Sequence, residues 1–246
     1  MDPMEIPNFD PIVNQVVPRT AKLQNASWAP QHHFRWLVVG PSGSGKTNAV
    51  LHALLNGIKF DRLYLYAKDL MEGKYIFLQK LFNSIEEASV SDGQKDKIPI
   101  MHVGNKTSDI IPVDDLNRDL THVVIFDDFI LEKNQESMLE YFVRGRKQNC
   151  SMIYISQSYF DVPKTIRLNC NYFSIYEVPT RNELTQLCKD HCAGVSFDEF
   201  QGMYKKATND RHSFLLIDKV SNVDIMKFRK NFIGVRVGGL SPNTAF

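Results

Sequence analysis

The sequence predicts an α/β protein with a mainly parallel central sheet and helices on both faces. Short apolar segments of strand length alternate along the chain with segments of helical periodicity, as in strands joined by crossover helices. One of these strands ends in a glycine-rich loop that opens a helix. With 43% hydrophobic residues among 246, the chain can bury one substantial core. We therefore expect one domain, over residues 31–246.

The individual elements follow from apolar runs and from helical spacing. Strands are predicted at residues 34–39, 63–66, 98–102, 122–126, 152–156, 172–176 and 213–217. Helices are predicted from about residue 49 after the glycine loop, and at 75–82, 135–146, 181–192 and 197–207. Residues 91–97 form a polar loop, and residues 1–30, with five prolines and no sustained period, form an extended arm outside the core.

Composition and charge exclude several classes of protein. The net charge of +1 lacks the basic excess of a protein that coats nucleic acid, so any DNA contact must be local. The four cysteines (Cys150, Cys170, Cys188 and Cys192) do not form a disulfide framework, which favours a reducing compartment. No run of about 18 apolar residues occurs, and acidic residues come early in the chain. We expect a soluble protein that is not secreted and has no membrane partner.

The glycine-rich loop matches the phosphate-binding pattern G-x-x-x-x-G-K-[ST] in full. Its residues are Gly40, Pro41, Ser42, Gly43, Ser44, Gly45, Lys46 and Thr47. The glycines allow backbone N–H groups to turn inward around phosphates, and the helix that follows adds its positive N-terminal end. Lys46 is expected to reach the β- and γ-phosphates of ATP, and Thr47 to offer its hydroxyl to Mg²⁺. Because the loop lies between a strand and a helix, a chance glycine turn is disfavoured.

Two carboxylates end the apolar strand His122–Phe126. Asp127, directly at the strand end, is expected to hold Mg²⁺, directly or through water. Asp128 is expected to orient and deprotonate the attacking water. An ordinary polar turn is the alternative, but adjacent carboxylates repel one another unless a cation is near, which favours a metal site beside a complete phosphate loop.

Spacing distinguishes the class of phosphate-loop enzyme. Between Lys46 and Asp127 there is room for more than one strand and helix, and the next strand after the loop lacks the aspartate typical of GTPases. This favours the additional-strand ATPase class. Gln157 follows the strand 152–156, which we place beside the phosphate-loop strand, on its other side. Gln157 is expected to sense the γ-phosphate or position water, although glutamine is also common at exposed strand ends.

These segments together resemble the FtsK-HerA superfamily of genome-packaging ATPases. The resemblance rests on Leu37–Thr47, Ile125–Asp128, Phe142–Asn149 and Tyr154–Tyr159, within about residues 34–217. It is closest to the enzymes of poxviruses, other large DNA viruses, virophages and polinton-type elements. The resemblance implies a RecA-like fold and a homo-oligomeric ring, usually a hexamer, that drives double-stranded DNA into a capsid. It also implies a capsid or portal-vertex partner, and a location inside the host cell at the site of virus assembly, or in the virion.

The resemblance further implies an arginine that acts on the ATP of a neighbouring subunit. The matching position is Arg146, with Arg144 as the alternative; both also simply complement a helix C-terminus. Weaker candidates are Arg167, Asn169 and Asn171, for the nucleotide or the next subunit, with a solvated loop as an equal alternative. Lys68, Lys74, Lys95 and Lys97 are weaker candidates for a central pore, although a scattered lysine is usually just solvated. The metal-like spacing of Cys188, His191 and Cys192 is more simply explained by buried cysteine.

Three other functions compete with the packaging motor. One is a cellular or plasmid DNA-transfer ATPase of the same superfamily, which the short chain disfavours because no membrane anchor or DNA-reading domain fits beside the motor. Another is a switch whose nucleotide controls assembly, for which turnover would be slow and insensitive to DNA. A small-molecule kinase is disfavoured because no arginine-rich lid follows the core.

Overall fold

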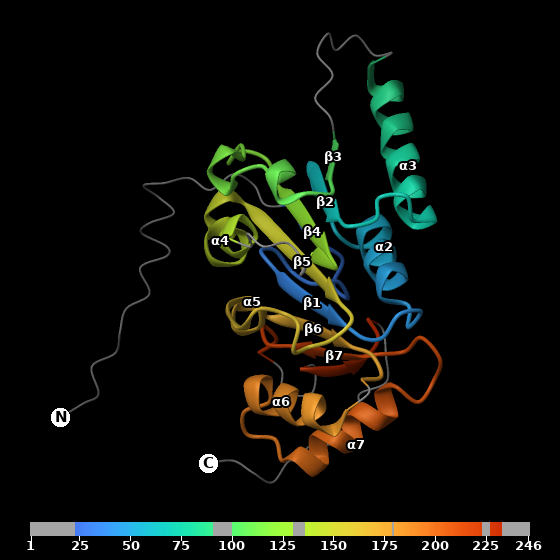
Figure 1. The fold of residues 1–246 in the computed structure, drawn as a ribbon, viewed down its shortest axis with the longest axis vertical. Helices are drawn as coiled ribbons and strands as arrows, with labels where there is room; N and C mark the ends of the chain where they lie inside the picture. Colours follow the sequence, from blue (N-terminus) through green and yellow to red (C-terminus); the bar gives the residue numbers. More distant parts are fainter. Residues whose placement is uncertain (1–22, 91–99, 130–135, 179, 223–226, 233–246) are drawn as a thin grey trace, which may run out of the picture.

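An eight-stranded sheet forms the centre of the molecule (Figure 1). The structure is a computed structural model and describes residues 23–90, 100–129, 136–178, 180–222 and 227–232. The strands lie in the order β3-β2-β4-β5-β1-β6-β7-β8. Their bounds are β1 Arg35–Val39, β2 Arg62–Ala67, β3 Met101–Gly104, β4 His122–Asp127, β5 Cys150–Ser156, β6 Tyr172–Ile175, β7 Leu215–Asp218 and β8 Phe228–Lys230.

Six neighbouring strands, from β3 to β6, are parallel, and β7 and β8 extend the sheet antiparallel at one edge. β5 lies between β1 and β4, with Val39 opposite Ser156 and Asp127 opposite Ile155. The inserted strand confirms the additional-strand class. Our placement of the strand 152–156 on the other side of the phosphate-loop strand was wrong, because the crossover from β4 returns the chain to the space between β4 and β1.

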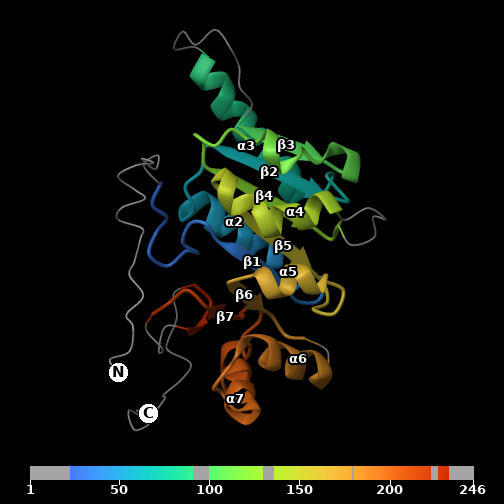
Figure 2. The same cartoon turned by 90° about the vertical axis from the view of Figure 1, so that its left-hand side faces the viewer.

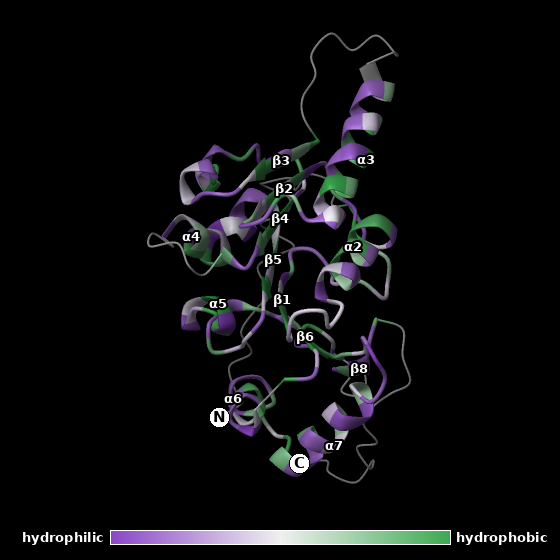
Figure 3. Cartoon of the chain, turned by 45° about the vertical axis from the view of Figure 1, so that its right-hand side comes forward, coloured by the Kyte–Doolittle hydropathy of each residue, from purple (hydrophilic) through white to green (hydrophobic). Residues whose placement is uncertain are grey.

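Helices cover both faces of the sheet, as Figure 3 shows with the sheet nearly edge-on. α2 (Lys46–Asn56) and α3 (Gly73–Val90) pack on one face, and α4 (Glu136–Arg144) and α5 (Lys164–Asn169) on the other. α6 (Arg181–His191) and α7 (Phe197–Ala207) lie on the same side as α4, below the β6–β7 part of the sheet (Figure 2). Successive strand residues point to opposite faces, so Leu37 joins the α4 side while Trp36 joins the α2 side. Two hydrophobic layers result.

Most elements lie where the sequence predicts them. The helix predicted at 135–146 ends at Arg144 and continues as a 3₁₀ turn, η4 (Gly145–Gln148). Four elements that the periodicity does not predict are α5, β8 and two short 3₁₀ turns, η1 (Thr107–Asp109) and η2 (Val113–Asp115). All are shorter than two helical turns or four strand residues, and such lengths carry little periodic signal. The predicted loop 91–97 lies outside the described residues. Within the described chain, no helix is long and apolar enough to cross a membrane.

Part of the predicted N-terminal arm packs on the domain. The N–H of Ala26 donates to the carbonyl of Gly57 at 2.8 Å, and the carboxamide oxygen of Asn25 accepts from the N–H of Lys59 at 2.9 Å. The Trp28 ring stacks on His52 of α2 with 5.2 Å between ring centroids. Residues 23–30 therefore support the outer side of α2, and residues 1–22 of the predicted arm lie outside the described chain.

Candidate active site

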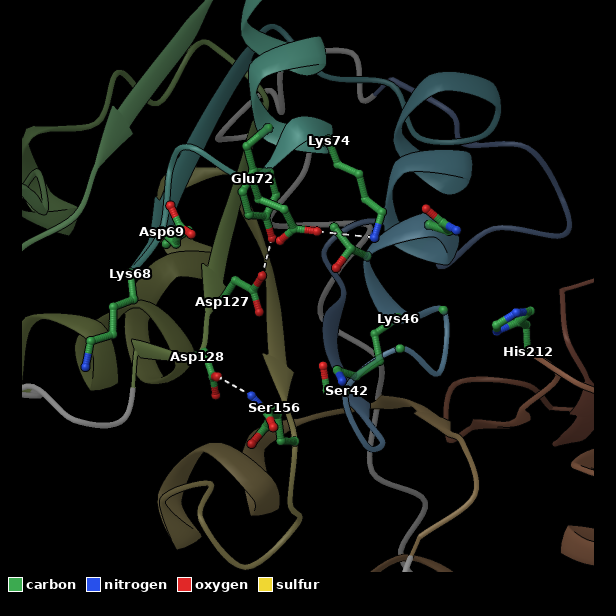
Figure 4. A pocket seen from close by; sticks show the side chains of 17 residues that line it. Ser42, Lys46, Lys68, Asp69, Glu72, Lys74, Asp127, Asp128, Ser156 and His212 are labelled. Carbon is green, nitrogen blue, oxygen red and sulfur yellow. Dashed lines mark hydrogen bonds and ion pairs between the residues drawn. The ribbon is translucent and has the colours of Figure 1, made fainter.

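A polar cavity of about 370 Å³ lies at the carboxyl ends of β1, β2, β4 and β5. In parallel α/β sheets this edge is where ligands bind, because loops and helix N-termini converge there. Figure 4 shows Asp127 and Asp128 on one side of the pocket, across from Lys46 and Ser42 of the phosphate loop. The cavity is lined by Ser42, Gly43, Gly45, Lys46, Thr47, Asn48, Ala67, Lys68, Asp69, Glu72, Lys74, Tyr75, Asp127, Asp128, Ser156, Gln157 and His212.

The phosphate loop has a backbone that only glycine adopts freely at its key turns. Gly45 has φ 104° and precedes the first residue of α2, so the loop turns directly into the helix N-terminus. Gly40 lies so close to Tyr176 that a Cβ atom there would be 2.4 Å from the Tyr176 Cβ. The first turn of α2 has no side-chain cap and no acidic residue. Its free N–H groups and positive dipole end therefore suit an anion.

Lys46 folds back over the loop that precedes it. Its Nζ donates to the carbonyl of Gly40 at 2.6 Å and to that of Pro41 at 2.9 Å. Burial lowers the pKa of Lys46, and the nearby carboxylates of Asp127 and Asp128 oppose this effect. The ammonium is thus buried and makes no ion pair with a carboxylate among the described residues. Such a charge is available to an anion that enters the cavity.

Asp127 ends β4 and is held by Tyr75, which lies outside the sequence motifs. The hydroxyl of Tyr75, in the first turn of α3, donates to the Asp127 carboxylate, and it also interacts with the side chain of Thr47. Burial raises the pKa of Asp127 to about 6, and the hydrogen bond from Tyr75 opposes the rise. Because β2 neighbours β4, a residue early in the helix after β2 arrives at Asp127. Only the strand order reveals this.

Asp128 and Gln157 form a direct pair across neighbouring strand ends. The Gln157 Nε2 donates to the Asp128 Oδ2 at 2.7 Å. Asp128 has φ 52°, in the left-handed region, and its N–H donates to the carbonyl of Ile155 at 3.2 Å. This backbone turn aims the carboxylate at Gln157, directly after β5, so the structure brings together the two side chains that the sequence placed near the γ-phosphate.

The loop after β2 and the first turn of α3 supply further charge to the cavity. Glu72 and Lys74 form an ion pair of 3.2 Å, and Glu72 also raises the pKa of Asp127. Lys68 and Lys74, which the sequence suggested for a pore, both line this cavity. Lys95 and Lys97, suggested for the same role, lie outside the described residues.

Arg146 lies far from the cavity within its own subunit. η4 immediately precedes β5, so Arg146 lies at the amino end of the parallel strands, whereas the phosphate loop lies at their carboxyl end. Arg146 is exposed and makes no hydrogen bond or ion pair within the described chain. Arg144 is instead bound to Asp114 at 3.1 Å and to Glu140 at 3.0 Å. Of the two arginines, Arg146 is the one free to contact another molecule.

The remaining sequence candidates have internal roles. Arg167 lies in α5, with its guanidinium 4.6 Å from the centre of the Tyr159 ring, and Asn171 accepts from the N–H of Arg35 at 2.7 Å. Asn169 donates to the carbonyl of Thr165 within α5. Cys188, His191 and Cys192 are buried, and no group of three metal-ligating residues occurs in the described segments. The solvated loop considered for Arg167 is in fact helical.

The sequence did not single out Tyr176 and His212, which both contact the phosphate loop. The Tyr176 hydroxyl donates to the carbonyl of Gly45 at 3.2 Å. His212, just before β7, has φ 65°, and its Nδ1 lies 3.2 Å from the carbonyl oxygen of Ser44. Tyr176 directly follows β6, the strand beside β1, so its position at a strand end was the available signal.

Comparisons with known proteins agree with this geometry. A family model described as the poxvirus A32 protein matches residues 22–220. No curated protein sequence matches the chain. Among solved structures, the genome packaging NTPase B204 from Sulfolobus turreted icosahedral virus 2 in complex with AMP is 14% identical, with a TM-score of 0.53, over 82% of this chain and 98% of that chain. The same protein with AMPPCP gives a TM-score of 0.50, with equal identity and coverage. The shared feature is a RecA-like α/β fold.

Proposed function

This chain belongs to the poxvirus A32 protein family, and we propose that it is an ATP-hydrolysing motor that packages double-stranded viral DNA. The observation that carries the chemistry is the arrangement of Asp128 and Gln157 beside the phosphate loop. Gln157 directly follows β5, the strand inserted between the two motif strands, and its Nε2 donates to the Asp128 carboxylate at 2.7 Å. A carboxylate so placed can take a proton from water that attacks a terminal phosphate.

The cavity suits ATP with Mg²⁺. Residues 40–47 would hold the phosphates through backbone N–H groups and the Lys46 ammonium. The Thr47 hydroxyl and the Asp127 carboxylate are the hard oxygen ligands that Mg²⁺ prefers. The carboxylates of Asp128 and Glu72 disfavour the charged form of Asp127, and a divalent cation bound there would offset this repulsion. A bound Mg²⁺ supplies neutralisation of the charge that develops on the phosphates.

Arg146 supports a ring in which each active site is completed by a neighbour. An arginine at the amino edge of the sheet cannot serve the phosphate loop at the carboxyl edge of the same subunit, whereas a head-to-tail neighbour presents that edge to it. We propose a homo-oligomeric ring, a hexamer, with Arg146 as the residue that acts across the interface. Membership of this family supports our proposal that the motor acts on double-stranded DNA with a capsid or portal-vertex partner. We propose that it works inside the infected host cell at the site of assembly, or in the virion.

The domain assignment is part of the same proposal. Residues 31–246 form the ATPase, and residues 1–30 form an arm of which 23–30 lie along α2.

The test compares ATPase rates with and without duplex DNA, at low salt and at a concentration where the ring is shown to form. We expect DNA to raise the rate, and the effect to fade with salt as phosphate contacts are lost. Asp128→Asn should still bind ATP while its turnover falls by about two or more orders of magnitude. A slow rate that DNA does not change would favour a nucleotide-controlled assembly switch. Near-normal turnover in Asp128→Asn would show that another residue is the general base.

A further inference from the structure

A second cavity begins where the phosphate cavity ends. It has a volume of about 400 Å³ and lies between α2 and the strands β6, β7 and β8. Its lining is Gly45, Asn48, Ala49, His52, Tyr176, His212, Phe214, Asn231 and Phe232. Gly45, Asn48 and His212 also line the phosphate cavity. The first turn of α2 therefore forms a shared border, and one molecule can occupy both cavities.

The positions of the catalytic residues determine which end of ATP points toward the second cavity. The proposal that follows rests on the proposed ATPase function. Asp127 and Asp128 are where water would attack, so the terminal phosphate must face them. Figure 4 shows His212 on the opposite side of the phosphate loop from these two carboxylates. The nucleoside end of ATP must then leave the loop toward His212.

The walls of this groove suit a flat aromatic ring. His52 and His212 are exposed on its two sides, and Phe214 and Phe232 are buried behind it. The buried rings support one another, with 5.3 Å between the centroids of Phe214 and Phe232 and 5.0 Å between those of Tyr176 and Phe214. The His52 ring is backed by Trp28 at 5.2 Å. Sites for planar ligands combine apolar walls with a few fixed polar groups.

The polar groups of the groove are also fixed. The Asn231 Oδ1 accepts from the N–H of Phe214 at 3.0 Å, which orients the carboxamide, and its N–H donors make no hydrogen bond within the described chain. His212 keeps a left-handed backbone, with φ 65°, while its ring is held at the carbonyl of Ser44. Strained backbone of this kind persists where surrounding contacts hold it, and it is common at ligand sites.

A third cavity is a weaker match. It has a volume of about 340 Å³ and lies behind the phosphate loop, between residues 41–44 and 208–213. It does not reach Asn48 on the first turn of α2, and the charged side chains of Asp210 and Arg211 line it. We propose that the groove between α2 and β8 binds the nucleobase of ATP, with His52 and His212 stacking on the ring.

The experiment separates the base from the phosphates. Binding of AMPPCP and of inorganic tripolyphosphate, each with Mg²⁺, is measured by calorimetry for the wild type and for His52→Ala, His212→Ala and His52→Phe. We expect His52→Ala to weaken AMPPCP by about fivefold to a hundredfold, the range for loss of one base-stacking side chain, and to leave tripolyphosphate within about twofold. His212 also contacts the phosphate loop, so His212→Ala should weaken AMPPCP more than it weakens tripolyphosphate. His52→Phe keeps a flat ring and should restore most of the lost affinity. Thermal melting checks that the variants are folded.

Each other outcome has a definite meaning. Arg211→Ala, on the rim of the third cavity, is the matched control and should change neither affinity. His212 lines both cavities, so His52 is the residue that separates them. Selective loss of AMPPCP binding in Arg211→Ala, but not in His52→Ala, would assign the base to the third cavity and overturn the inference. So would equal weakening of both ligands, or a wild type that binds them equally tightly. A wild type that binds neither ligand would refute the phosphate site itself, and the proposed function with it.

Discussion

Replacing Asp127 by asparagine should stabilise the ligand-free protein at neutral and higher pH. Burial raises the pKa of this carboxyl from 3.8 to about 6. The folded chain therefore binds the proton more tightly than the unfolded chain does. The stability that the group provides is fully present below about pH 3.8, and it is lost as the pH rises through about 6.

The size of the effect follows from the same pKa. A rise from 3.8 to about 6 corresponds to about 3 kcal/mol between the two protonation states. This is an upper value, because Asp127 is only partly shielded from water. Asp127→Asn removes the titration and keeps an oxygen that accepts from Tyr75. Its advantage over the wild type should be at most ~3 kcal/mol at pH 8 and should shrink to at most ~0.5 kcal/mol at pH 4.

Urea unfolding of both proteins without nucleotide or divalent cation, at pH 4, 6 and 8, measures this difference. Asp69→Asn, an exposed carboxylate on the rim of the same cavity, is the control and should show no comparable change with pH. If the wild type were as stable as Asp127→Asn at pH 8, burial would not be disfavouring this charge. The site would then have no buried, disfavoured charge for a cation to neutralise.

The remaining predictions concern catalysis. Gln157→Ala should lower kcat by about tenfold or more with little change in KM, because the hydrogen bond at 2.7 Å orients Asp128 for the chemical step; a change in KM alone would assign Gln157 to binding. Tyr75→Phe removes a bond that lowers the pKa of Asp127, so half-maximal activity should need more Mg²⁺ at pH 6.5 than at pH 8, relative to the wild type. Arg146→Ala and Asp128→Asn subunits, each nearly inactive, should regain activity when co-assembled, because an arginine finger contributes about 10³-fold or more. If a mixture that is shown to co-assemble has no more ATPase activity than either variant alone, Arg146 does not act across the interface.

Sequence reasoning located the residues of the site that lie in contiguous motifs. The phosphate loop, Asp127 and Asp128 are each read from one short segment, and Gln157 follows from the strand that precedes it. Their convergence at one edge was predictable, because parallel strands bring their carboxyl ends together. The position of β5 between β1 and β4 was not predictable from the sequence. An apolar run indicates that a strand exists, but it does not indicate which strands lie beside it.

The residues that were missed are brought in by topology alone. Tyr75 reaches Asp127 because β2 pairs with β4, and His212 reaches the phosphate loop because the chain returns to it before β7. Nothing in the local sequence around either residue marks a site. The packing of Trp28 on α2 was missed for a related reason. Its segment is rich in proline and polar residues, and no periodic pattern there predicts contact with the domain.

The left-handed backbone of Asp128 restricts which residues natural variation can place there. At φ 52°, most side chains meet steric resistance, whereas aspartate, asparagine and glycine are tolerated. Glycine and asparagine would keep the turn and lose the acid, and Asp128→Glu would keep the acid at the cost of backbone strain. It would also carry the carboxylate past the amide of Gln157. Related chains that retain this turn should therefore retain aspartate, and those that carry glutamate should have an extended backbone at this position.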